Sequence, residues 1–159
     1  MTDLLQPGAC IGILGGGQLG RMLSVAASRL GLRCHIYDPA PNPPAGHVAE
    51  TVTTAAWDDT GALRAFAGSV DVITYEFENI PAATLDLLET LRPVRPGRRA
   101  LAVSQDRLTE KDFLTGLGLI CAPCRDSPDA AALDAALAEI GTPAILKTRR
   151  LGYDGKGQA

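Results

Sequence analysis

The last residues of the chain combine lysine and glycine in a pattern that suits binding of a polyphosphate. A short apolar run delivers Lys147, and a glycine-rich loop at residues 152–158 carries Lys156 at its tip. Glycines allow backbone N–H groups to approach an anion closely, and lysine supplies a compact positive charge. The alternative is a solvated β-hairpin tip, but two of the chain's three lysines lie here. We therefore predict a phosphate-binding loop.

A second glycine cluster lies near the N-terminus. Gly15, Gly17 and Gly20 have the G-x-G-x-x-G spacing, between an apolar run at residues 10–14 and a helix-period segment at residues 18–30. Such a strand, turn and helix let the helix N-terminus face an anion. The next expected strand ends at Asp38, where a dinucleotide-binding domain places its ribose-binding acid. A nicotinamide-dependent oxidoreductase is therefore an alternative to an ATP-using enzyme.

Two carboxylates follow the expected strand at residues 70–75. Period-two alternation places Glu76 and Glu78 on one face, at the carboxyl end of a parallel strand, where open α/β sheets bind ligands. These side chains suit the hydroxyl or amine donors of a ligand. The alternative is a pair of solvated acids that cap the next helix.

Composition limits the classes of protein. A chain of 159 residues can bury one good core, or one domain and the beginning of another, and we favour the latter. No apolar stretch has the length of a membrane span, and residues 1–8 lack a signal-peptide pattern, so we expect a cytoplasmic location. A net charge of −3 with 4% aromatic residues does not favour nucleic-acid binding.

The cysteines do not predict a metal or redox site. Cys121 and Cys124 form a C-x-x-C pair, but zinc needs two further ligands and the sequence offers no second pair. A redox pair typically opens a helix, whereas the next expected helix begins only near Asp129. We interpret this pair as structural, and Cys10 and Cys34 as buried strand residues.

The elements that position these residues alternate along the chain. A βαβ series of this kind predicts a parallel sheet covered by helices on both faces. We expect residues 92–99, which are rich in arginine and proline, to be a solvated linker. The expected strands are residues 10–14, 33–37, 48–53, 70–75, 92–95 and 144–149, and the expected helices are residues 18–30, 59–67, 81–91, 106–117 and 129–140.

Four ordered motifs carry a family resemblance. They are GGGQLGRM from Gly15, YEFEN from Tyr75, QDRLTEK from Gln105 and LKTRRLGYDGKGQ from Leu146. With these motifs the chain resembles the 5-(carboxyamino)imidazole ribonucleotide synthetases, the ATP-grasp carboxylases of purine biosynthesis. The resemblance implies an α/β fold, with a Rossmann-like, parallel-sheet pre-ATP-grasp domain at residues 1–97 and the first, incomplete part of an ATP-grasp domain at residues 98–159.

The resemblance also implies an activity. ATP would phosphorylate bicarbonate, and the carbon dioxide released from carboxyphosphate would be captured by the 5-amino group of aminoimidazole ribonucleotide. Family members are longer, so we expect the return strand of the loop, the adenine pocket, the Mg²⁺ ligands and catalytic competence to require residues beyond this chain. A homodimer is implied as well. A non-catalytic nucleotide-sensing domain remains a third hypothesis.

Individual residues receive roles through the same resemblance. Tyr153 and Lys156 would be catalytic, near bicarbonate and the transferred phosphoryl group. Gln18 and Leu19, together with Glu78, would face the aminoimidazole ribonucleotide, which reassigns the G-x-G-x-x-G turn from a dinucleotide to a ribonucleotide. The residues that would bind ATP are Arg107, Lys147, Gly152, Tyr153, Asp154, Gly155, Lys156, Gly157 and Gln158.

Overall fold

The computed structural model describes residues 4–152 and 155–159. The chain forms two compact units, Met1–Leu101 and Ala102–Ala159. Among the described residues, no helix is long and apolar enough to cross a membrane.

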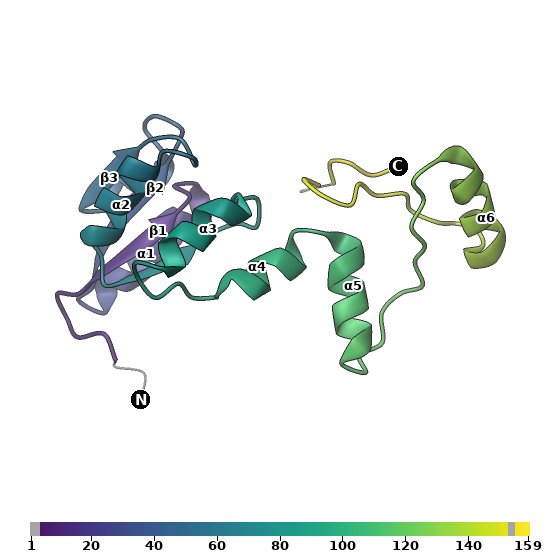
Figure 1. Cartoon of the computed structure of the whole chain (residues 1–159), viewed down its shortest axis with the longest axis horizontal. Coiled ribbons are helices and arrows are strands. Elements are labelled where there is room, and N and C mark those ends of the chain that lie inside the picture. Colours follow the sequence, from purple (N-terminus) through teal and green to yellow (C-terminus); the bar gives the residue numbers. More distant parts are fainter. Residues whose placement is uncertain (1–3, 153–154) are drawn as a thin grey trace. The chain divides into compact units, whose positions relative to one another are not determined.

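The first unit is built on a four-stranded parallel sheet with strand order β3-β2-β1-β4. Figure 1 labels β1, β2 and β3 of this sheet. Val94 adds a single parallel bridge to Ile73, where a strand at residues 92–95 was expected. The strand order reverses between β1 and β4, the place where open α/β sheets bind ligands. The predicted parallel α/β sheet is therefore confirmed. The strands are β1 at Cys10–Leu14, β2 at Arg33–Asp38, β3 at Thr51–Thr54 and β4 at Val72–Tyr75.

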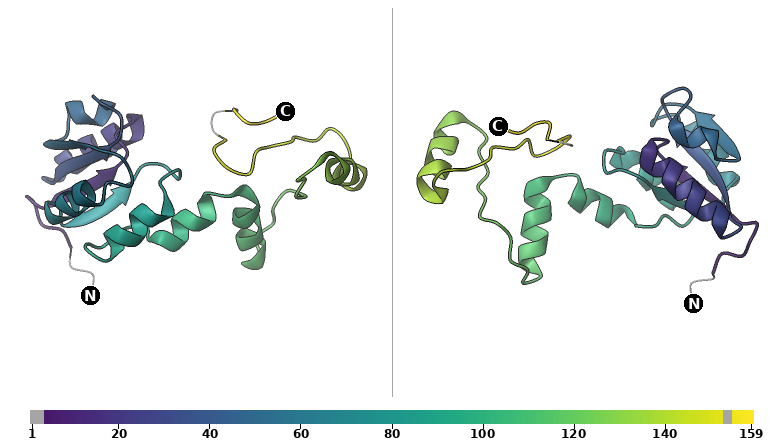
Figure 2. Two further views of the ribbon diagram at one scale, coloured as in Figure 1. Left: turned by 45° about the horizontal axis from the view of Figure 1, so that its top comes forward. Right: turned by 180° about the vertical axis from the view of Figure 1, so that it is seen from behind.

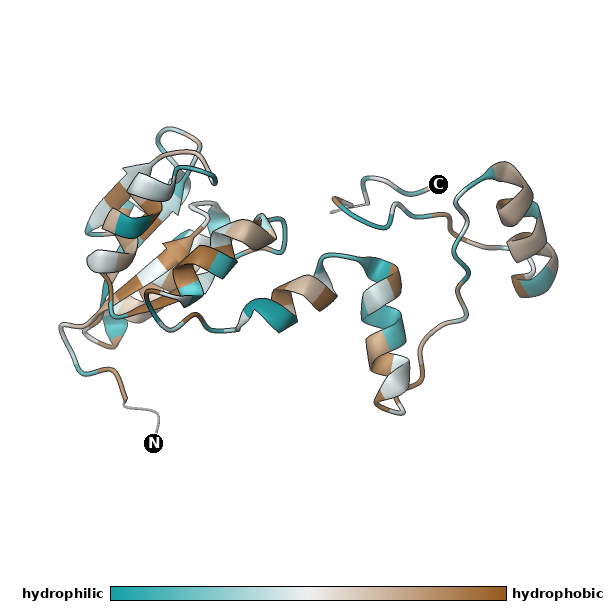
Figure 3. Cartoon of the chain, in the orientation of Figure 1, coloured by the Kyte–Doolittle hydropathy of each residue, from teal (hydrophilic) through white to brown (hydrophobic). Residues whose placement is uncertain are grey.

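Helices cover both faces of this sheet. Helix α1, Gln18–Arg29, lies on one face, while α2, Thr60–Gly68, and α3, Ala82–Glu89, lie on the other; Figure 2 shows α1 in front when the molecule is seen from behind. Alternating strand residues supply the two apolar layers, such as Ile13 toward α1 and Leu14 toward α2 and α3. In Figure 3, hydrophobic segments, coloured brown, recur along the strands and helices of this unit.

The arginine-rich segment that was expected to be a solvated linker contains a helix. Helix α4 spans Arg98–Ser104, and its Leu101 is buried in the core of the first unit. Arg92 donates from Nε to the carbonyl of Val70, and the amide of Arg98 donates to Glu89. The linker prediction was wrong because Val94, inside the segment, and Leu101, just after it, are both buried in the core of the first unit. The abundance of arginine, proline and glycine around them hid these two apolar residues.

The second unit contains two helices that begin where aspartates predict. Helix α5 spans Arg107–Gly116 and is capped by Asp106, and α6 spans Ala130–Ile140 and is capped by Asp129. Ala136 is the only described residue of this unit that is buried. The two units therefore differ sharply in how much apolar core they contain.

Candidate functional site

The glycine turn of the first unit lies at the carboxyl ends of β1 and β4. The amide of Gly15 donates to the carbonyl of Tyr37, and the amide of Glu76 donates to the carbonyl of Leu14, so the ladder continues past the strands. The turn leads directly into α1, whose first residues, Gln18 and Leu19, are exposed. Both predicted ribonucleotide-binding side chains of the turn are thus accessible to a ligand.

Two carboxylates of the chain accept hydrogen bonds from the backbone amides of this turn. Glu76 accepts a hydrogen bond from the amide of Gly17 at 2.7 Å and a second, short one from the amide of Gly20. Asp38 accepts from the amide of Gly16 at 2.6 Å. The backbone amides that would bind the pyrophosphate of a dinucleotide therefore already donate to side chains of the chain itself.

The expectation that Glu76 serves a ligand's donors together with Glu78 was wrong. Glu76 reaches the glycine turn because β4 lies next to β1, a neighbour relation that follows from strand order and that alternation along one strand does not reveal. The alternative role as a cap of the next helix was wrong too, since Pro81 occupies the N-cap of α3 and no side chain caps it.

Glu78 is half-buried in the segment that Glu76 ties to the turn. Its Oε1 lies 3.4 Å from Nδ2 of Asn79, which donates to it. The segment that carries Glu78 and the turn that carries Gln18 and Leu19 are therefore held together at the carboxyl edge of the sheet.

In the second unit, the lysine-bearing segment forms a closed hairpin. Leu146 and Ala159 exchange backbone hydrogen bonds of 2.9 Å, and the amide of Thr148 donates to the carbonyl of Gly157 at 2.8 Å. Lys147 pairs with Gln158 in an antiparallel bridge and is exposed. Contrary to expectation, residues 157–159 supply the beginning of a return strand, whereas the expected strand at residues 144–149 is reduced to this bridge.

Glycine is required inside this hairpin. Gly157 has φ 68°, and a Cβ there would lie 2.5 Å from Oγ1 of Thr148. Gly155 has φ 77°. Side chains would be strained at both positions, so the backbone at Gly155 and Gly157 requires glycine.

Arg107 fastens the loop to the start of α5. Its Nη2 donates to the carbonyl of Gly152 at 3.2 Å, and its amide donates to the carbonyl of Arg149 at 3.0 Å. The structure thus brings together Arg107 and the loop, two features separated by more than forty residues in the sequence. Both were predicted to bind ATP.

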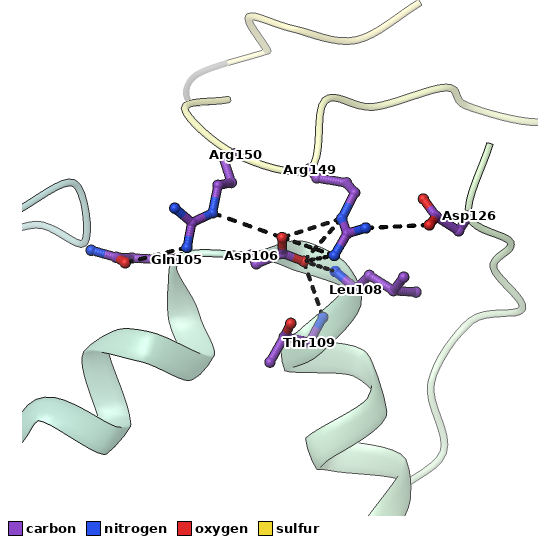
Figure 4. A network of polar contacts seen from close by, with 7 residues as sticks. All are labelled: Gln105, Asp106, Leu108, Thr109, Asp126, Arg149 and Arg150. Atoms are coloured by element: carbon purple, nitrogen blue, oxygen red, sulfur yellow. Dashed lines mark hydrogen bonds and ion pairs between the residues drawn. The ribbon is translucent and has the colours of Figure 1, made fainter. Parts of the chain in front are cut away.

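Asp106 stabilises the base of the same hairpin (Figure 4). It caps α5 through the amides of Leu108 and Thr109 and accepts a hydrogen bond from Nη2 of Arg149 at 3.0 Å. The hydrogen bond from Arg149 lowers the pKa of Asp106, and the same contact raises the pKa of Arg149. Arg150 lies 3.8 Å from the Asp106 carboxylate. Sequence reasoning identified Asp106 as a cap but missed its contact with the hairpin.

The other predicted positions are the remaining residues of the loop and the C-x-x-C pair. Tyr153 and Asp154 lie outside the described residues, while Lys156 lies in the loop. Among the residues that the structure describes, no group of three or more histidine, cysteine, aspartate or glutamate side chains is placed to hold a metal ion. Cys121 and Cys124 are free thiols of intermediate exposure.

Comparison with known families identifies the class of the chain. The sequence model of the ribonucleotide synthetase preATP-grasp domain matches residues 9–105, which include the whole parallel sheet and the glycine turn. The chain belongs to this family, and the resemblance inferred from the four motifs is confirmed.

Known relatives extend the likeness along the chain. An N5-carboxyaminoimidazole ribonucleotide synthase of Brucella melitensis is 52% identical over 97% of this chain, which spans 42% of that enzyme's length. The N5-carboxyaminoimidazole synthetase of Staphylococcus aureus complexed with ADP is 43% identical, with TM-score 0.91 over 97% of this chain and 41% of that one. The Aspergillus clavatus synthase in complex with ADP and 5-aminoimidazole ribonucleotide is 28% identical, with TM-score 0.83 over 98% of this chain and 41% of that one.

Proposed function

We propose that this chain is the N-terminal portion of an ATP-grasp ligase that makes 5-(carboxyamino)imidazole ribonucleotide in purine biosynthesis. The observation that carries the proposal is the closed lysine and glycine hairpin, which Arg107 fastens to α5. Relatives of the same fold bind ADP, and one also binds 5-aminoimidazole ribonucleotide. The substrates would be ATP, bicarbonate and aminoimidazole ribonucleotide.

The second unit would bind the phosphates of ATP. Lys147 would supply positive charge from the base of the hairpin and Lys156 from its loop, while residues 152–158 would fold over the phosphates. Arg107 would hold the loop through the Gly152 carbonyl and contact the nucleotide with its remaining donors. Tyr153 and Lys156 would lie near bicarbonate and the phosphoryl group.

The first unit would bind the aminoimidazole ribonucleotide. Gln18 and Leu19 are exposed at the first turn of α1, and Glu78 lies on the segment tied to that turn by Glu76. Ligands of open α/β sheets bind at this reversal of strand order. The boundary expected at residue 97 falls before α4, whose Leu101 completes the core of the first unit, so we propose that the ATP-grasp domain begins after Leu101.

The reaction would depend mainly on positioning and charge. In phosphoryl transfer the protein orients the reactants and neutralises charge on the transferred group, a task that suits Lys147 and Lys156. Mg²⁺ would be held by residues beyond this chain and would supply further positive charge to offset that of the phosphates. Attack of the 5-amino group on carbon dioxide then forms the new carbon–nitrogen bond and releases a proton. We propose a cytoplasmic homodimer for the whole enzyme.

A hybrid enzyme tests this function. The chain replaces the corresponding segment of the Brucella relative, and phosphate release is measured with ATP, bicarbonate and aminoimidazole ribonucleotide together and with each omitted. We expect full turnover only when all three are present. The 159-residue chain alone should release no phosphate, because adenine and Mg²⁺ require residues beyond it.

Two results would contradict the proposal. A folded hybrid without turnover would favour a non-catalytic nucleotide-sensing domain. Micromolar binding of NAD or NADP to the chain in a calorimetric titration would favour the oxidoreductase. The hydrogen bonds from the turn amides to Glu76 and Asp38 argue against that second outcome.

A further inference from the structure

The three glycines of the G-x-G-x-x-G motif leave room where side chains would otherwise lie, and the side chain of Glu76 fills that room. A Cβ on Gly15 would lie 2.6 Å from Cγ of Glu76, and a Cβ on Gly17 would lie 2.7 Å from its Oε1. A Cβ on Gly20 would lie 3.1 Å from Oε2 and 2.7 Å from the carbonyl oxygen of Gly15. All three glycines of the motif therefore surround one carboxylate of the chain itself.

The same carboxylate supplies the negative charge that the start of α1 lacks. The N-cap of α1 is Gly17, which offers no side-chain acceptor, and the first turn contains no acidic residue. Glu76 accepts hydrogen bonds from the amide of the N-cap, Gly17, and from the amide of Gly20, the third residue of α1. Glu76 and Gly20 are 56 residues apart in sequence. A carboxylate at a helix N-terminus is stabilised by the helix dipole and by charge-assisted hydrogen bonds.

Asp38 completes the arrangement from the neighbouring strand. It accepts from the amide of Gly16 through Oδ2 and from the amide of Ala40 through Oδ1 at 2.7 Å. An Asp38 held in this way has both oxygens engaged by backbone amides, which does not suit the ribose-binding role of a dinucleotide domain.

We propose that Glu76, assisted by Asp38, is an internal anion that takes the place of a ligand's pyrophosphate at the glycine turn. Glu76 is thus a specificity-determining residue, because it closes the amide site to dinucleotides and holds the first turn of α1 in place. The proposal concerns the turn alone and does not depend on the carboxylase function.

The test asks whether removal of the carboxylate opens an anion site. Inorganic pyrophosphate is titrated into the 159-residue chain, and the amide resonances of Gly17 and Gly20 are followed by NMR together with the thermal midpoint. We expect no saturable shift of the Gly17 and Gly20 amides in the unmodified chain, because pyrophosphate bound at the loop of the second unit is reported by that loop's own resonances. In Glu76→Ala the same two amides should report pyrophosphate binding at least about tenfold tighter, because the freed amides regain a charged acceptor.

Asp71→Ala is the matched control. Asp71 also accepts a backbone amide, that of Cys10 at 2.8 Å, but at the opposite end of β1. Its removal changes the net charge by the same amount and breaks the same kind of hydrogen bond. We expect Asp71→Ala to bind pyrophosphate no better than the unmodified chain, and equal gains in both variants would overturn the proposal.

Glu76→Gln keeps the test decisive where Glu76→Ala unfolds. Glutamine preserves the volume and one acceptor but faces the second amide with its own NH₂ group, so pyrophosphate binding should lie between the unmodified chain and the alanine variant. Refolding of Glu76→Ala by pyrophosphate would also support the proposal. Absence of pyrophosphate binding and of refolding in both variants would overturn it.

Discussion

The two glycine loops of this chain have similar composition but opposite electrostatic surroundings. In the first unit, the amides of the turn donate to Glu76 and Asp38, so the turn already holds negative charge. In the second unit, Lys147 and Arg107 flank the glycine loop, and Arg107 contacts it through a carbonyl oxygen. Only the second loop has the cationic surroundings that suit a polyphosphate.

This difference shows what glycine spacing does and does not predict. Glycines mark places where the backbone is approached closely, because a Cβ there would clash or would be strained. They do not reveal what approaches. At Gly17 the approaching group is Glu76, whereas at Gly157 it is Thr148 of the same hairpin.

The largest expected effect is at the second loop. In the hybrid enzyme, Lys147→Ala should lower kcat by about 100-fold, because the phosphoryl group loses one lysine charge that offsets its negative charge in the transition state. Lys111→Ala is the control: it removes a lysine of the same unit that donates to the carbonyl of Ala122. A loss of activity equal in both variants would show that Lys147 does not act on phosphate.

The next effect tests the packing of the first loop. Gly17→Ala should destabilise the first unit by about 2 kcal/mol, because its Cβ would lie 2.7 Å from Oε1 of Glu76. In a Glu76→Ala background the same substitution should be much less harmful. Urea unfolding of both single variants and the double variant measures this coupling, with Gly68→Ala, where a Cβ meets nothing within 4 Å, as the additive control.

A smaller effect is expected at the base of the hairpin. Asp106→Ala should speed hydrogen exchange of the Thr148 amide, because among the described residues Arg149 keeps only Asp126 as a carboxylate partner and the hairpin keeps only Arg107 as an anchor to α5. Asp129→Ala removes a comparable N-cap, that of α6, whose carboxylate accepts from the amide of Ala132. Unchanged exchange in Asp106→Ala, or equal acceleration in both variants, would contradict the proposed anchoring.

The smallest expected effect is a difference between the two units in how their stability depends on pH. Burial lowers the pKa of His35, so the unfolded chain takes up a proton near the ordinary value of 6.5 before the folded chain does. Stability of the first unit should therefore fall as pH drops below 6.5 toward the lowered pKa. Asp106 in the second unit loses its contribution only below its ordinary pKa of 3.8, as pH falls through its lowered value.

Urea titrations at about pH 7.5 and about pH 5.5 check the first part. The decrease in the free energy of unfolding should be smaller in His35→Gln, whereas His47→Gln serves as the control for loss of a histidine. If the free energy of unfolding of His35→Gln decreases between the two pH values as much as that of the unmodified chain, the hydrogen bonds of His35 to Ser69 and Thr53 stabilise the protonated ring as well.

Much of the fold was predictable from local patterns. The alternation of apolar runs with helix-period segments predicted the parallel sheet, and Asp106 and Asp129 correctly marked two helix starts. The start of α2 was expected at Asp58 or Asp59, and the structure places the cap at Asp59. Helix α4 was missed because only Leu101 signals its burial, and a short helix with one apolar anchor leaves little periodicity.

The candidate sites were predictable only in part, because their contacts join distant segments. The motifs indicated the loop, Arg107 and Lys147, and the structure brings Arg107 to the loop. The roles of Glu76 and Asp38 depend on β1 lying between β2 and β4, and strand order is set by the packing of the whole sheet. The catalytic and binding roles of the individual residues remain predictions for the experiments above.

The burial of Leu101 has a consequence for synthesis on the ribosome. All four strands and the residues of both apolar layers lie at or before this position, so the first unit contains its whole core once residue 101 has emerged. Domains tend to fold as units, N-terminal first, during translation. We expect the first unit to fold while the lysine hairpin is still being synthesised, so that the nascent chain completes its parallel sheet and glycine turn before the hairpin exists.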